Sequence, residues 1–151
     1  MSTIEPLCFL ARVIPYKLSK QENLLLEAEL FSRIYIELKN FFGQQHKDFF
    51  RLMNFTVDME DTMLEANLLR FIIQDILLTE MYTLQGISYY SDTHEDVLQE
   101  IINGRNTSPS VKLFRRMVEL HREVKRDFYH AMIKKIMLEY AKQDTAIRYD
   151  D

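Results

Sequence analysis

The chain has 151 residues, which is enough for one domain with a buried core, alone or with a helical extension. Its apolar fraction of 47% and charged fraction of 28% are those of a soluble globular protein and argue against an integral membrane protein. Only three glycines and three prolines occur, and good helix formers are abundant, so we expect an all-α fold.

The first residues carry one short apolar run and a single cysteine, Cys8. One thiol cannot form an intramolecular disulfide, which agrees with a reducing compartment. The run at residues 7–14 is interrupted by Arg12, follows no basic residue and is too short to span a bilayer. We therefore expect a cytoplasmic protein that makes no contact with a membrane.

Residues 1–60 are expected to form an N-terminal helical extension used for packing or dimerisation. A capping box at residues 19–22 predicts the start of a helix with apolar residues every three or four positions, and Gly43 predicts its end. A short second helix is expected around residues 46–54. Seven aromatic side chains of this extension need a surface to pack on, either the rest of the chain or a second copy of it: Phe31, Tyr35, Phe41, Phe42, Phe49, Phe50 and Phe55.

Residues 61–124 are expected to form a second, more compact region. A capping box at residues 62–65 predicts a strongly apolar helix that ends near Met81. Thr83 is then predicted to cap a short helix, and Asp92, which tolerates the left-handed conformation, to form the turn after it. Thr93, with Asp96 three residues on, predicts the start of another short helix.

Sequence signals also predict where the helix that starts near Thr93 ends and where the next helix begins. Asn103-Gly104 predicts a glycine stop. Ser108 before Pro109 predicts an N-cap followed by proline at the first helical position, where proline is tolerated. Two short helices joined by a tight turn, with the small Ser88 at their crossing, are typical of a helix-turn-helix.

Residues 64–122 resemble the DNA-binding domain of the lambda-repressor/Cro (XRE-type) family. Thr83 stands at the opening Ser of the family pattern, and Ile87-Ser88 stands at its Leu-Ala pair. Asn103-Gly104-Arg105 stands at Asn-Gly-Lys, and Pro109-Ser110 at Pro-Ser after one extra residue. The resemblance implies a lambda-repressor-like helix-turn-helix bundle and a dimeric transcriptional regulator that binds a short, roughly palindromic operator in double-stranded DNA.

The resemblance also implies which residues face DNA. The first turn of the recognition helix would face base edges with four residues: His94, Glu95, Asp96 and Gln99. Phosphates would be contacted from the opening cap, from the loop after the recognition helix and from the basic face of the next helix: Thr83, Arg105, Asn106, Thr107, Ser108, Lys112, Arg115 and Arg116.

Several positions depart from the family pattern. Glu95, Asp96 and Glu100 bring negative charge towards phosphates, although a carboxylate can accept from the amino group of cytosine. Leu84 stands where the family has a phosphate-anchoring Gln, and Ser91 replaces a core leucine. A second hypothesis therefore stays open. The chain would be a non-enzymatic helical adaptor with a protein partner that kept the fold and lost DNA binding.

Charge is distributed unevenly along the chain. Residues 104–142 hold ten basic and four acidic residues, whereas the whole chain has a net charge of −4. This basic segment is what a polyanion-facing region on an acidic protein would look like, and it is equally typical of a solvated helix face.

Residues 125–151 are expected to form a C-terminal amphipathic helix over about 127–142 and a frayed tail. Phe128, Met132, Ile136 and Tyr140 lie on one stripe, which would pack on the core or on a second copy of the chain. The four histidines (His46, His94, His121, His130) have no metal-ligand spacing, and no phosphate-binding loop or nucleophile motif occurs. We expect no enzyme activity, no metal and no cofactor.

Overall fold

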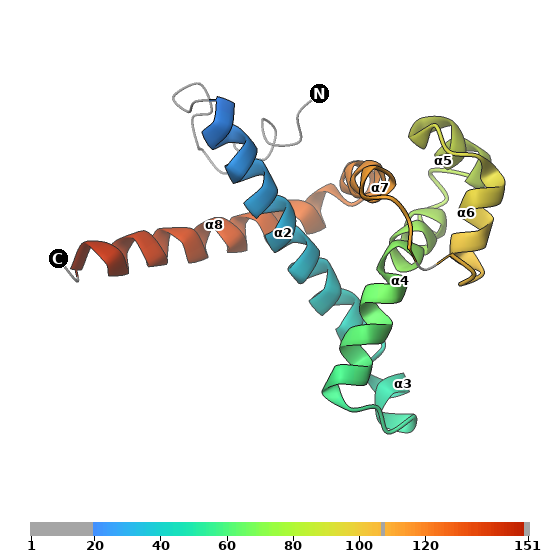
Figure 1. The fold of residues 1–151 in the computed structure, drawn as a ribbon, viewed down its shortest axis with the longest axis horizontal. Helices are drawn as coiled ribbons and strands as arrows, with labels where there is room; N and C mark the ends of the chain where they lie inside the picture. The colour runs from blue at the N-terminus through green and yellow to red at the C-terminus, as the bar shows by residue number, and fades with distance from the viewer. Residues whose placement is uncertain (1–19, 107, 150–151) are drawn as a thin grey trace. The chain divides into compact units, whose positions relative to one another are not determined.

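The computed structural model describes the backbone of residues 20–106 and 108–149, and the side chains of residues 24, 27–106 and 108–139. Within this part of the chain all regular structure is helical and no strand occurs, which confirms the predicted all-α fold (Figure 1). The helices are α2 (Lys20–Gln45), α3 (Lys47–Leu52), α4 (Val57–Leu78), α5 (Leu84–Ser91), α6 (Glu95–Ile102), α7 (Val111–Val124) and α8 (Arg126–Tyr149).

The helices form two compact units. Unit 1 contains the chain up to Glu37 together with the chain from Arg126 onwards, and unit 2 is Leu38–Lys125. The expected division between residues 60 and 61 lies inside α4 and within unit 2. The expected change at residue 125 does coincide with a break, since Lys125 separates α7 from α8.

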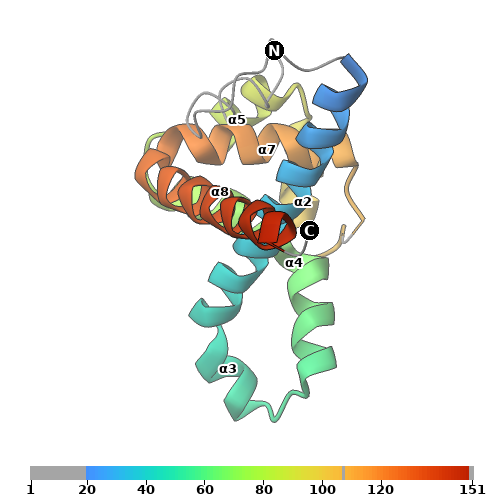
Figure 2. The same ribbon diagram turned by 90° about the vertical axis from the view of Figure 1, so that its left-hand side faces the viewer.

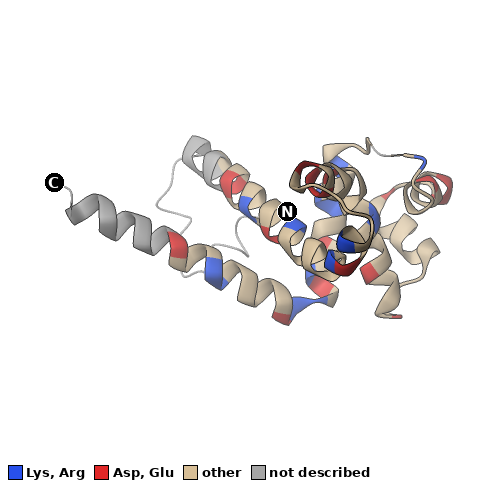
Figure 3. Ribbon diagram, turned by 90° about the horizontal axis from the view of Figure 1, so that it is seen from below, with Lys and Arg blue, Asp and Glu red and all other residues tan. Residues whose placement is uncertain are grey.

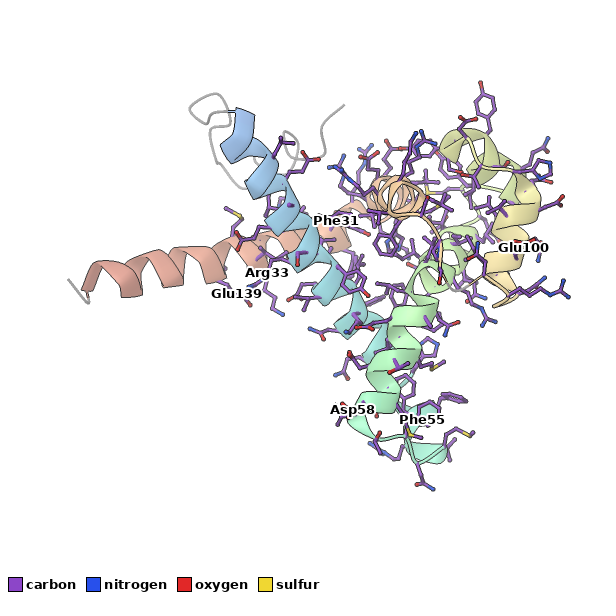
Figure 4. The ribbon with its side chains drawn as sticks, in the orientation of Figure 1. Phe31, Arg33, Phe55, Asp58, Glu100 and Glu139 are labelled. Carbon is purple, nitrogen blue, oxygen red and sulfur yellow. The ribbon has the colours of Figure 1, made fainter. Side chains whose placement is uncertain are left out.

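In unit 1, α2 and α8 are joined by ion pairs. Arg33 pairs with Glu139, and both are labelled in Figure 4. Lys135 Nζ lies 3.0 Å from Glu37 Oε2. Helix α8 continues to Tyr149, so the tail expected to fray after residue 143 is helical. The buried side chains of unit 1 are Leu30 and Ile34 from α2, and Tyr129, Met132, Ile133 and Ile136 from α8.

Unit 2 is organised around α4. This helix contacts α6 and α7, and α5 contacts α6 and α7 in turn, so the four helices share one core (Figures 1 and 2). Buried apolar side chains come from every one of them, which accounts for the apolar periodicity of the sequence. They include Leu68, Ile72, Ile73 and Ile76 of α4, Ile87 of α5, Leu98 and Ile101 of α6, and Met117, Val118 and Leu120 of α7.

Gly43 does not end α2, which continues to Gln45. A Cβ atom at Gly43 would lie 3.2 Å from Leu64 Cδ1, so the missing side chain lets α4 approach α2 closely. The glycine is thus explained by packing, and the expectation of a helix stop is wrong. Lys39 holds the same two helices together through Asp61 and Glu65, and the hydrogen bond to Asp61 raises the pKa of Lys39.

Two predicted caps are also wrong, each by a few residues. Helix α4 begins after Thr56, whose Oγ1 accepts from the Met59 N–H at 3.2 Å, whereas Thr62 Oγ1 donates to the Asp58 carbonyl inside the helix. Helix α7 begins after Ser110, whose Oγ accepts from the Leu113 N–H at 3.1 Å, and Ser108 lies outside it. In both places the sequence has two hydroxyl residues a few positions apart, and the one at the observed start of the helix is the cap.

One polar pair lies within the core of unit 2. His121 of α7 is fully buried, and its Nε2 lies 2.6 Å from Asp75 Oδ2 of α4. The imidazole ring stacks near Phe42, with 6.5 Å between ring centroids. Burial lowers the pKa of His121 from its ordinary value, and the Asp75 carboxylate opposes this effect without overcoming it.

The lowered pKa of His121 gives stability a defined pH dependence. The unfolded chain binds a proton at this histidine near pH 6.5, whereas the folded chain stays neutral to lower pH. The contribution of the neutral His121 to the free energy of unfolding is therefore fully present above about pH 6.5. It falls as the solution is acidified, by at most about 1.4 kcal/mol per pH unit.

Replacement His121→Gln keeps an N–H donor for Asp75 and cannot titrate. We expect urea unfolding between pH 7 and 5.5 to show a smaller loss for this variant than for the wild type, and an equal loss would contradict this assignment.

Candidate nucleic-acid interface

Helices α5 and α6 are joined by only three residues, 92–94. Asp92 has φ 51° and ψ 44°, so it adopts the left-handed conformation that was predicted for it. Thr83 caps α5, as predicted, by accepting from the Gly86 N–H at 3.1 Å. The chain therefore leaves one short helix and enters the next at a new angle, because one left-handed residue redirects the backbone.

Hydrogen bonds hold this turn in place. The Thr93 N–H donates to the Ser88 carbonyl at 3.1 Å, and the Ser88 hydroxyl donates back to the Thr93 carbonyl. Ser91, fully buried, donates from Oγ to the Ile87 carbonyl at 2.7 Å, which satisfies the one polar atom in its side chain. A serine can therefore occupy this buried position.

The cap of α6 differs from the prediction. His94 is the N-cap, and its Nδ1 accepts from the Asp96 N–H at 3.1 Å. Thr93, predicted as the cap, instead donates from Oγ1 to the Ser91 carbonyl at 3.2 Å. Because Thr93 is used inside the turn, the next residue satisfies the free N–H groups of α6.

The four residues expected to face bases all lie on the surface of the first turns of α6. His94, Glu95, Asp96 and Gln99 are exposed, and Leu98 between them is fully buried. Glu100 is exposed as well, which gives this helix three carboxylates and no basic residue. Figure 3 colours the acidic residues of the chain red, and Glu100 is labelled in Figure 4.

The loop after α6 is ordered by its own backbone. Gly104 has φ 75°, as a glycine stop requires, and the Arg105 N–H donates to the Glu100 carbonyl at 2.8 Å. Asn106 accepts at Oδ1 from the Ser108 N–H at 3.1 Å, so its side chain shapes the loop. Thr107 lies outside the described residues. Arg105 is exposed and lies next to this fixed turn.

The basic residues of α7 differ in their surroundings. Lys112 is exposed in the first turn, whereas Arg115 and Arg116 are half-buried. Arg116 Nη1 donates to the Ser91 carbonyl, so this guanidinium binds the last turn of α5. A cation at a helix C-terminus is favourable because of the helix dipole. Of the residues expected to contact phosphate, Arg105 and Lys112 present exposed cations, and Arg116 has this intramolecular role.

Sequence reasoning missed two features of this surface. The bond from Arg116 to Ser91 joins residues 25 positions apart, so no local pattern could indicate it. Tyr89 of α5 is 91% exposed and extends the surface with an aromatic ring. Its position opposite the buried Ile87 on a short helix was a signal that could have been used.

A metal site and a membrane-spanning helix are two further features that the described residues could contain. Their His, Cys, Asp and Glu side chains nowhere gather in groups of three that could hold a metal ion. Among the same residues, no helix combines the length and the apolar character needed to cross a membrane. Comparison of the chain with protein-family models, with curated proteins and with solved structures finds no match.

The left-handed residue between α5 and α6 gives a direct test of the turn. We expect Asp92→Val to lower the free energy of unfolding by roughly 1–2 kcal/mol, because a β-branched residue is strained at positive φ. Asp92→Gly is the matched control and should stay close to the wild type, since glycine adopts this conformation freely. Urea denaturation measures both. Equal stability of the Val and Gly variants would show that Asp92 does not hold this conformation in solution.

Proposed function

We propose that the chain is a DNA-binding transcriptional regulator of the lambda-repressor/Cro type, which acts on a short operator as a homodimer. The observation that carries this proposal is the exposed first half of α6, presented after a three-residue turn from α5. Such a turn lets a second helix enter the major groove while the first crosses the backbone. The buried faces of the two helices hold that edge against α4 and α7.

The order of the helices in unit 2 supports the proposal. Helix α4 precedes the pair and packs on α6, and α7 follows the pair and packs on both α4 and α5. In the resembling family, one helix precedes the reading pair and the loop after it contacts phosphate. Arg105 and Lys112 lie in that loop and at the start of the helix that follows, which puts two exposed cations at the expected place.

The carboxylates of α6 limit the kind of DNA binding that is physically reasonable. Glu95, Asp96 and Glu100 repel phosphates, so α6 contributes to affinity only where its acids meet donors such as the cytosine amino group. Phosphate contacts then come from few cations, and the affinity for random DNA is low and strongly reduced by salt. Selectivity for an operator would depend on base contacts by His94 and Gln99 together with these acids.

The two exposed cations provide the test. We expect the wild type to bind a random 30-base-pair duplex at low salt, with binding that weakens as salt rises. Replacement of Arg105 and Lys112 by Glu should abolish this binding, because it removes two phosphate contacts and adds repulsion. Fluorescence anisotropy over a salt series measures both proteins. The matched control is Arg126→Glu/Lys134→Glu, which makes the same change of net charge at exposed residues of α8 in unit 1.

The control separates a local contact from a general effect of charge. The α8 variant should bind nearly as well as the wild type. If it loses binding to the same extent, the effect is one of net charge and the assigned surface is wrong. If the wild type shows no binding to duplex DNA or heparin at low salt, the regulator proposal is rejected.

The exposed acids of α6 favour one second candidate, a non-enzymatic adaptor that binds a basic protein partner through this face. Glu95, Asp96 and Glu100 form a negative surface that suits cationic side chains. The variant Glu95→Gln/Glu100→Gln distinguishes the two candidates. For a DNA-binding protein we expect its affinity for random duplex to rise about two- to five-fold, because two repulsive charges are removed. Unchanged DNA affinity would show that α6 does not approach the duplex and would favour the adaptor.

A further inference from the structure

An apolar surface lies where α3 is joined to α4. Five side chains of this segment, which we call the α3–α4 tip, are exposed: Phe49, Leu52, Met53, Val57 and Met59. Leu52 and Val57 are 82% and 80% exposed, values expected for polar residues. Scattered single apolar residues are normal on a surface, but five within eleven positions indicate an interaction site. Within unit 2 the tip lies at the end remote from α5 and α6 (Figures 1 and 2).

Contacts between aromatic rings order the α3–α4 tip and join it to the rest of unit 2. Phe50 is buried and stacks on Phe55 with 5.6 Å between centroids, and Phe49 meets Phe55 edge to face at 5.9 Å. His46 stacks on Phe71 of α4 at 4.4 Å, which ties α3 to the core of unit 2. A surface that is already ordered loses little conformational entropy when it binds. Phe55 and Asp58 are labelled at the tip in Figure 4.

The charges beside the tip are divided between its two helices. Helix α3 carries Lys47 and Arg51 with a single acid, Asp48, whereas the first turn of α4 carries Asp58 and Glu60. A two-fold symmetric contact can place α3 of each copy against α4 of the other, and both of these pairings bring opposite charges together. The charge pattern is therefore complementary to itself.

A groove adjoins the apolar residues. It has a volume of about 320 Å³ and lies between the end of α2 and the start of α4. Its lining includes Lys47, Val57 and Glu60, so the groove and the tip form one continuous surface. An exposed side chain of a second copy, such as Leu52, fits a recess of this kind.

We propose that the α3–α4 tip is the contact through which two copies of this chain form a symmetric dimer. The inference rests on the proposed function, which requires a homodimer, and on the self-complementary charges that favour a second copy over a foreign protein. A stable interface takes about 800 Å² from each partner. The apolar tip supplies its centre, and the flanking charged residues and the groove supply its rim.

Sedimentation velocity of the full chain over a concentration series tests the proposal. The wild type should be a dimer at micromolar concentration. Leu52→Glu, at a side chain that is already exposed, should raise the dissociation constant at least tenfold without altering the helical circular dichroism signal. The matched control is Leu138→Glu, at another exposed leucine, on α8 of unit 1, and it should leave the dimer intact.

A charge exchange tests the symmetric arrangement itself. One variant carries Lys47→Glu/Arg51→Glu and so has acids on both helices, and the other carries Asp58→Lys/Glu60→Lys and has bases on both. Each variant alone should be monomeric, because both pairings across the two-fold axis become repulsive. An equimolar mixture should recover a dimer of one copy of each, because both pairings become attractive again.

Several outcomes overturn the inference. A wild type that is monomeric at all concentrations means that the tip serves another occupant, such as a foreign protein. A dimer that survives Leu52→Glu but not Leu138→Glu places the contact on α8. A mixture that stays monomeric excludes the symmetric pairing. Mass is measured without DNA, so a dimer of the expected kind that fails to bind DNA rejects the proposed function and leaves this inference standing.

Discussion

The packing of α7 on α4 is the contact on which the rest of unit 2 depends. Both helices of the exposed pair lie against this layer, α5 on α7 and α6 on α4. Within this layer, His121 of α7 and Asp75 of α4 bind each other. A buried polar pair of this kind fixes the register of two helices, since a shift of either one would leave a polar atom without a partner. The angle at which α6 meets solvent follows from that register.

The sequence predicted those features of the fold that depend on neighbouring residues. Helical periodicity, the Thr83 cap, the left-handed Asp92 and the Gly104 stop all arise within a few positions of the residue concerned. The errors arose where two local choices were equally good or where a distant contact decided the outcome. Thr56 and Thr62 are both good caps, and Gly43 could end a helix, but the approach of Leu64 gives that glycine another use.

The candidate site likewise has some features that local sequence could predict and others that it could not. The exposure of His94, Glu95, Asp96 and Gln99 follows from the period of α6, because Leu98 and Ile101 fix the buried side of the helix. The differing surroundings of Lys112 and Arg116 could not be predicted, since they depend on how α7 lies across α5. A basic run in a sequence therefore overstates the number of cations that a polyanion can reach.

The exposed pair has a mechanical property that follows from its bonding. Most hydrogen bonds of residues 83–106 connect residues within the segment, and Arg116 to Ser91 is a bond that ties it to α7. Helices of eight residues have little stability of their own. The segment therefore depends for its stability on the apolar side chains that it buries in the shared core, Ile87, Leu98 and Ile101. Its exposed edge therefore keeps its shape only while that core stays packed.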